Sequence, residues 1–175
     1  MGDLIADAQR EYAGTRLAFV NTGRIRAGLR AGPVTYGDLF TAQPFQDDYV
    51  DTLKLTGAQV WALLRQQFQP PDNRVMQVSG LHFTYASSGP GQGTIQAVYL
   101  GGAGDGLDAD PDDDSPTYTA TADSFMVGGG DGFTELTKAT DIVQTADSEL
   151  QPLLDYVGKL PDPFRYAVDG RIDRS

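Results

Sequence analysis

Residues 2–26 have the sequence GDLIADAQREYAGTRLAFVNTGRIR, in which a helix pattern, a strand pattern and a glycine-containing loop follow one another. Apolar residues recur at helical spacing over residues 3–13, which predicts a helix. Residues 16–21 form an apolar run that predicts a buried strand. The loop 21–26 leaves the end of that strand, where ligand loops often lie. This opening therefore favours a domain that mixes helices and strands.

The rest of the chain continues this mixture. A capping box of Thr56 and Gln59 opens a strong helix, and Ser148 and Gln151 form a second box. We expect a single α+β (mixed α/β) domain over residues 1–175, with a mixed sheet of five or six strands packed by about four helices. The further predicted helices are 35–40, 56–70 with an apolar face that includes Phe68, and one that opens at Ser148; the further predicted strands are 48–55, 75–86, 94–100, 118–122 and 164–172, with the last at a sheet edge.

Composition excludes several classes of protein. The formal net charge of -11 and the pI near 4.3 argue against a general nucleic-acid binder, although placed arginines can still hold a phosphate. The chain has no cysteine, which excludes disulfides and cysteine-based zinc sites. No apolar run approaches the roughly 18 residues of a membrane helix, so we expect no membrane span.

Two features that could suggest a metal site are better explained without one. His82 is the only histidine, and one histidine builds neither a zinc site nor a Ser-His-Asp triad without unusual partners, so we expect a structural role. Six aspartates lie in the loop 105–114, but Asp113 replaces the glycine of an EF-hand and Thr119 its final glutamate. We expect this loop to be mobile and solvated rather than to bind calcium specifically.

Three segments are candidates for ligand binding. In the loop 21–26, Gly23 permits close backbone approach to an anion and Arg26 can pair with a phosphate, although a solvated turn is the simpler interpretation. The stretch 124–133, with three consecutive glycines, suits either a tight turn or an aromatic wall beside a carboxylate. Phe45 is ordinarily a core residue, unless a second exposed ring faces it across a flat ligand.

Six short blocks follow one another along the chain, namely Gly2–Ala8, Asn21–Arg26, Val34–Leu39, Gln43–Phe45, Gln77–Leu81, and Phe125 with Gly129–Phe133. Taken in this order, they resemble the C-terminal domain of bacterial and animal 5'-nucleotidases, and the resemblance covers nearly the whole chain. The loop 21–26, for example, resembles the family's Asn-Gly-Gly-Gly-Ile-Arg loop.

The resemblance implies a division of labour. In the family this domain holds the nucleoside, and a preceding calcineurin-like metallophosphatase domain carries two divalent metals and the chemistry. Two phenylalanines stack on the base, a carboxylate binds the ribose hydroxyls, an arginine contacts the phosphate and an asparagine lies near the base. These features correspond to Phe45 and Phe125, Asp131, Arg26, and Asn21, and Gly23 belongs to the same loop.

It follows that the parent protein is expected to hydrolyse a phosphate ester of a nucleotide, while the isolated chain is inactive and holds no cofactor. The expected partners are a nucleotide or nucleoside and the N-terminal metallophosphatase domain, and the family's habit implies a location outside the cytoplasm. Some relatives act on thiosulfonate esters instead. A free-standing nucleoside-binding or cell-surface module without chemistry is the alternative.

Two departures from the family pattern bear on the phosphate contact. Arg24 stands where the family usually has glycine, so the local backbone or the phosphate contact can differ. The family also places a phosphate-binding arginine upstream of the Gly-Asp-Leu-Ile block, and this chain begins after that point.

Overall fold

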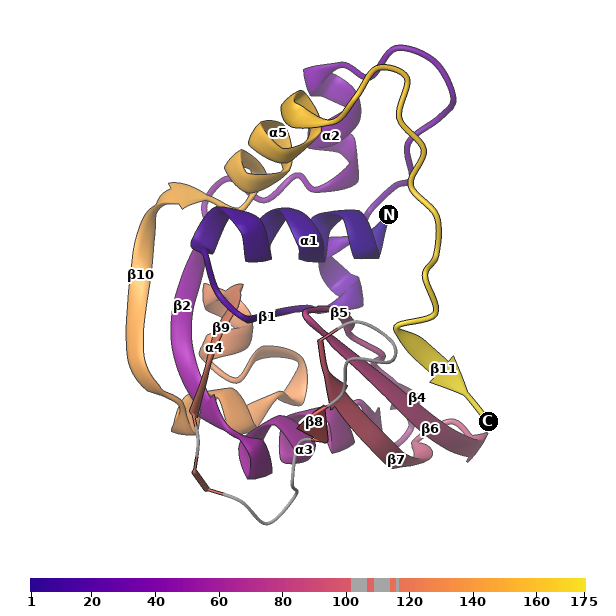
Figure 1. Cartoon of the computed structure of the whole chain (residues 1–175), viewed down its shortest axis with the longest axis vertical. Coiled ribbons are helices and arrows are strands. Elements are labelled where there is room, and N and C mark those ends of the chain that lie inside the picture. Colours follow the sequence, from indigo (N-terminus) through magenta and orange to yellow (C-terminus); the bar gives the residue numbers. More distant parts are fainter. Residues whose placement is uncertain (102–106, 109–113, 116) are drawn as a thin grey trace.

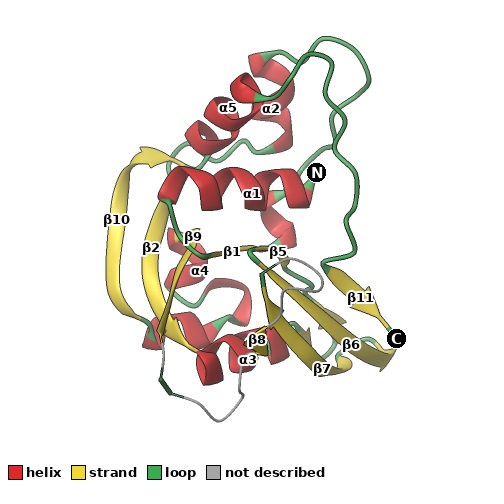
Figure 2. Cartoon of the chain, viewed as in Figure 1, coloured by secondary structure: helices red, strands yellow, loops and turns green. Residues whose placement is uncertain are grey.

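The computed structural model describes residues 1–101, 107–108, 114–115 and 117–175. It confirms the α+β class, since helices cover mixed sheets (Figure 2). Within the described residues, the α-helices are α1 (Gly2–Ala13), α2 (Tyr36–Ala42), α3 (Gly57–Arg65), α4 (Ser124–Val127) and α5 (Leu150–Lys159), and the 3-10 helices are η1 (Thr22–Arg24), η2 (Gly130–Gly132) and η3 (Thr134–Lys138).

The strands divide between two main sheets rather than forming one. The first has the order β10-β2-β9-β1-β5, in which β1 and β9 run parallel and the other neighbours antiparallel. Its strands are β1 (Leu17–Val20), β2 (Tyr49–Thr56), β5 (Gln77–Ser79), β9 (Thr117–Asp123) and β10 (Thr140–Ser148).

The second sheet has the order β11-β6-β7-β8, with β11 parallel to β6. Its strands are β6 (Leu81–Gly89), β7 (Gln92–Leu100), β8 (Leu107–Asp108) and β11 (Ile172–Arg174). A separate short hairpin joins β3 (Phe68–Gln69) and β4 (Asp72–Asn73).

Apolar side chains fill both faces of the first sheet. Figure 1 shows α1 lying across this sheet with α2 and α5 beyond it, whereas α3 and the second sheet lie on the other side. Leu17 and Phe19 of β1 belong to the cluster with α3, and Val20 belongs to the cluster with α1, α2 and α5. Because successive side chains of a strand alternate between faces, β1 is buried along its whole length.

Two predicted elements are shorter than their patterns suggested. The helix that opens at Thr56 ends at Arg65, because Gln67 is fully buried and bonds the carbonyl of Leu64 and the amide of Met76. Phe68 therefore leaves the helix and starts β3. The predicted strand 75–86 is two strands, since Gly80, with a φ of 77°, turns the chain from β5 in one sheet to β6 in the other.

The C-terminal third departs most from prediction. The Thr56 capping box is confirmed, but the Ser148 box is wrong: Ser148 pairs with Tyr49 at the end of β10, and no side chain caps α5. The sequence analysis missed β10 itself, whose mostly exposed side chains give no alternation. The C-terminal strand lies at a sheet edge as expected, but over Ile172–Arg174. Most of the aspartate loop, and hence its calcium prediction, lies outside the described residues.

Candidate functional site

The strand order brings four distant chain segments to one edge of the five-stranded sheet. β1 and β9 are parallel, so the loop that follows Val20 and the segment that follows Asp123 leave the sheet side by side. β2 is antiparallel to β9 and pairs Val50 with Asp123, so the loop before Tyr49 enters there too. Ser148 pairs with Tyr49, which places the start of α5 at the same edge.

The loop 21–26 forms the centre of this edge. Asn21 is 3% exposed and ends the strand, and η1 follows it immediately. The amide of Arg26 donates a 2.8 Å hydrogen bond to the carbonyl of Ala42, at the end of α2. The loop is therefore attached to the segment that carries Phe45.

The two predicted stacking residues come from α4 and from the loop after α2. The side chain of Asp123 caps α4 by accepting the amide of Met126 at 3.0 Å. This helix turn presents Phe125, which is 45% exposed and thus open to solvent. Phe45 is half-buried. Neither ring is a sealed core residue, as a stacking role requires.

Three of the four glycines in the stretch 128–132 answer a backbone or packing demand. Gly129 and Gly132 have φ values of 86° and 82°, in the left-handed region. A Cβ on Gly130 would meet ring carbons of Phe125 at 2.4–2.5 Å, so only glycine fits beside that ring. Asp131 also lies in the left-handed region, with a φ of 54°, which aspartate adopts more readily than most residues with a side chain.

That turn directs Asp131 back toward the loop 21–26. Its carboxylate accepts a 2.6 Å hydrogen bond from the amide nitrogen of Asn21 and pairs with Arg74 at 3.0 Å. A Cβ on Gly23 would lie 3.5 Å from the same carboxylate. The Asp131 side chain is 33% exposed, so its oxygens remain open to further donors.

Arg26 lies beside one of the two rings. The Cζ atom of its guanidinium is 5.2 Å from the centroid of Phe45, and its side chain is exposed. In the part of the chain that the structure describes, no carboxylate pairs with Arg26. The six residues that the sequence nominated, namely Asn21, Gly23, Arg26, Phe45, Phe125 and Asp131, therefore lie at one edge of the sheet.

Arg24 has a position that its sequence context does not predict. It is 4% exposed, and its Cζ lies 4.3 Å from the centroid of Phe45 and 5.2 Å from that of Phe125. Three carboxylates surround the guanidinium: Asp48 at 2.6 Å, Asp123 at 3.0 Å and Glu149 at 3.4 Å.

Burial makes two of these carboxyl groups, those of Asp123 and Glu149, hard to ionise. Burial raises the pKa of Glu149 to about 8, with a smaller contribution from the negative charge of Asp123, and it also raises the pKa of Asp123. Burial alone would lower the pKa of Arg24, but the carboxylates of Asp123 and Glu149 outweigh it and raise that pKa. The cation is thus permanent, while Glu149 takes up a proton near neutral pH.

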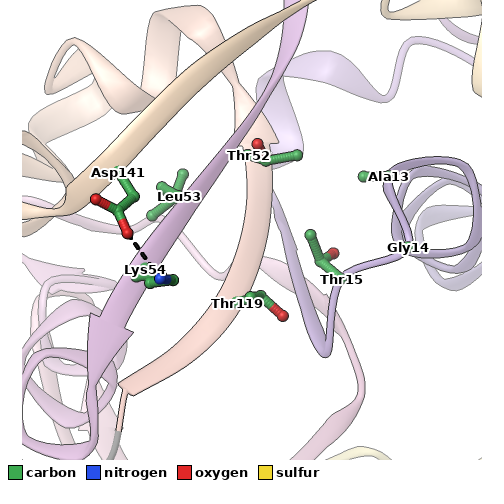
Figure 3. A pocket seen from close by; sticks show the side chains of 8 residues that line it. All are labelled: Ala13, Gly14, Thr15, Thr52, Leu53, Lys54, Thr119 and Asp141. Carbon is green, nitrogen blue, oxygen red and sulfur yellow. Dashed lines mark ion pairs between the residues drawn. The ribbon is translucent and has the colours of Figure 1, made fainter.

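Two hollows lie away from the aromatic pair. One of about 210 Å³ is lined by threonines and by the Lys54–Asp141 ion pair, whose atoms lie 2.7 Å apart (Figure 3). Another, of about 330 Å³, lies beside Arg171 and His82. The His82 ring is 5.9 Å from that of Tyr99 on the paired strand.

Among the described residues, no group of three or more His, Cys, Asp or Glu side chains could hold a metal ion.

The comparisons with known proteins agree on one family. The family model described as "5'-nucleotidase, C-terminal domain" matches residues 1–138. The chain belongs to this 5'-nucleotidase C-terminal domain family. The predicted resemblance is thereby confirmed.

Relatives of this domain are much longer than the chain. It is 31% identical over 173 residues to Endonuclease YhcR of Bacillus subtilis, covering 98% of the chain and 13% of the relative. It is 32% identical over 178 residues to a 5'-nucleotidase of Vibrio cholerae, covering 98% of the chain and 30% of the relative. The chain thus spans about a third or less of these relatives.

A solved structure shows the same fold. The 5'-nucleotidase precursor from Thermus thermophilus matches with a TM-score of 0.86 and 29% identity, over 99% of this chain and 34% of that one. In both the sequence and the structure comparisons, therefore, the domain corresponds to part of a longer protein.

Sequence reasoning missed three residues of the site. Arg24 stood out only as a departure from the family loop, which gave no hint that it would be buried. Arg74 follows the β3-β4 hairpin, and nothing in its sequence context indicates a contact with Asp131. Glu149 directly precedes α5, and only the pairing of β10 with β2 brings it to Arg24.

Proposed function

We propose that this domain binds the nucleoside part of a nucleotide, with the base between Phe45 and Phe125 and the ribose hydroxyls on Asp131. Arg26 would contact the phosphate, and Asn21 and Gly23 would shape the loop that faces the ligand. The parent protein would then be a 5'-nucleotidase-like hydrolase of a nucleotide phosphate ester.

The observation that carries this proposal is the convergence of the two rings on one point. Phe45 and Phe125 are 80 positions apart in the sequence, yet both lie within 5.2 Å of the same guanidinium carbon. Aromatic rings offer stacking surface to any flat base. The carboxylate of Asp131, anchored by Asn21 in the same loop, is a suitable acceptor for a diol.

The chemistry is assigned to a separate domain. The described residues offer no cluster of metal ligands, so hydrolysis by two divalent metals would require an N-terminal metallophosphatase domain of the same polypeptide. The low share of each relative that this chain covers fits such an arrangement. This chain's part is to bind and orient the substrate.

A location outside the cytoplasm is proposed on the relatives alone. One relative, 27% identical over 168 residues and covered to 21% of its length, is the cell wall protein Lmo0130 of Listeria monocytogenes. No helix in the described part of the chain is long and apolar enough to cross a membrane.

Titration calorimetry with adenosine tests the binding role. Adenosine is a better test ligand than AMP, because phosphate contacts expected from other parts of the parent protein would not contribute to binding by this chain. Stacking contributes on the order of 1–3 kcal/mol per base, so Phe125→Ala should weaken adenosine binding roughly 5- to 150-fold.

The matched control is Phe40→Ala. Phe40 is a second exposed phenylalanine, 37% exposed on α2, and it stacks with Tyr36. Its loss should leave adenosine affinity unchanged. Equal losses in both variants, or no binding by the unaltered chain, would refute the proposed function.

A further inference from the structure

Arg24 joins the two segments that carry the rings through two kinds of contact, with the rings themselves and with nearby carboxylates. The guanidinium contacts the ring of Phe45 at 4.3 Å and that of Phe125 at 5.2 Å. It also pairs with Asp48, three positions after Phe45, and with Asp123, two positions before Phe125. Each ring-bearing segment is therefore held by one ring contact and one ion pair.

The side chain is fixed from behind as well. Glu149, which is fully buried, lies 3.4 Å from the same Nη1 atom that donates to Asp48. A planar guanidinium with several donors can engage carboxylates and lie against aromatic rings at the same time, which a lysine ammonium cannot do in the same geometry. The surroundings of Arg24 match that property.

The exposed fractions of Arg24 and the two rings indicate on which side of Arg24 a ligand would enter. Arg24 is 4% exposed, whereas Phe125 is 45% exposed and Phe45 is half-buried. The guanidinium thus closes the inner end of the space near the two rings. A base in contact with both rings would lie on the solvent side of Arg24, because the guanidinium occupies the inner position.

From these contacts we infer that Arg24 is a positioning residue, which sets the separation of Phe45 and Phe125 and limits how deeply a base enters between them. The inference rests on the proposed function. The space between the two rings would therefore be shallower in this chain than with glycine at position 24. The spacing of the rings would also depend on a buried cation.

The test compares Arg24→Lys with Arg16→Lys. Lysine at 24 keeps a cation for the three carboxylates but loses the planar contact with both rings. Arg16 is the matched control, since its Cζ lies 5.0 Å from the ring of Tyr118, away from the site. We expect Arg24→Lys to weaken adenosine binding about fivefold or more, because rings that have lost their shared support stack less well on a base, and Arg16→Lys to leave it unchanged.

Two further measurements separate positioning from general damage. In the Phe125→Ala background, Arg24→Lys should cause a smaller loss of affinity than in the wild type, because one of the two rings that Arg24 spaces is gone. Without ligand, urea unfolding of Arg24→Lys, Phe125→Leu and the double variant should show non-additive changes in the unfolding equilibrium constant.

The affinity of Arg24→Lys and the unfolding cycle each test the positioning role. Wild-type affinity in Arg24→Lys would overturn the positioning role. Tighter binding would also overturn it, and would indicate that Arg24 only obstructs the space between the two rings. If the unaltered chain binds no adenosine, the proposed function fails, and the unfolding cycle alone then judges the inference: additive changes refute it, and non-additive changes support the link between Arg24 and Phe125.

Discussion

The side-chain amide of Asn21 donates a 2.6 Å hydrogen bond to the carboxylate of Asp131, 110 positions further along the chain. This bond connects the loop after β1 with the glycine-rich turn after α4. In that turn, the backbone of Asp131 has a left-handed conformation. The residue with the left-handed backbone is therefore also the one whose carboxylate is held by the loop after β1.

Replacing that carboxylate should affect ribose recognition and not the fold. We expect Asp131→Asn to weaken adenosine binding about tenfold, because a charged acceptor for hydroxyl groups is worth about 1.5–3 kcal/mol and asparagine tolerates the left-handed backbone. Calorimetry with adenosine and with 2',3'-dideoxyadenosine measures the effect. A similar loss for both ligands would contradict a contact with the ribose hydroxyls.

Gly130 and Gly158 form a matched pair for testing the turn. A Cβ on Gly130 would meet the Phe125 ring at 2.4 Å and displace it, whereas a Cβ on Gly158 of α5 meets nothing within 4 Å. We predict that Gly130→Ala lowers adenosine affinity severalfold. Gly158→Ala should keep the affinity and raise the free energy of unfolding by up to about 1 kcal/mol, as alanine does in helices. Unchanged affinity in Gly130→Ala would mean that the position of the ring does not matter.

The raised pKa of Glu149 predicts how stability depends on pH. Its pKa rises from the ordinary 4.5 to about 8, chiefly because the side chain is buried. Between these values the native state keeps a proton that the unfolded chain has released, so the free energy of unfolding falls as pH rises. The contribution of Glu149 is fully present below pH 4.5 and is lost as pH passes 8.

Urea unfolding from about pH 5 to about pH 8 measures this effect. The control is Glu149→Gln, which keeps an oxygen that can accept the amides of Gln9 and Gln43, both 3.4 Å from Oε1. The difference in unfolding free energy between wild type and variant should change with pH in this window, in favour of the wild type at the acid end. A constant difference would show that Glu149 titrates normally.

The division of labour predicts that the isolated chain releases no phosphate from AMP. Two adjacent metals need several His, Asp and Asn ligands, and no such cluster lies among the described residues. A colorimetric phosphate assay with manganese or zinc measures the activity, with a two-domain 5'-nucleotidase as positive control. Release above background by clean protein would place chemistry in this chain.

Local patterns predicted the elements whose signals are local. The Thr56 capping box and α1 were both read correctly, because a side-chain cap and an apolar helix face depend only on near neighbours. The break at Gly80 and the exposed strand β10 escaped prediction. Both depend on which strand lies alongside, and sequence periodicity does not report that.

By itself, the sequence determined the fold class and the family and nominated six candidate site residues, because family motifs and turn chemistry are encoded in short stretches. The tertiary structure alone decided that Arg24 lies against both rings. Its partners Asp48, Asp123 and Glu149 are far apart in the chain, and they meet because parallel β1 and β9, with β2 and β10 beside them, end at one edge of the sheet. The charge of a buried arginine is stabilised only where such pairing supplies carboxylates, so its role depends on contacts between segments that no local pattern connects.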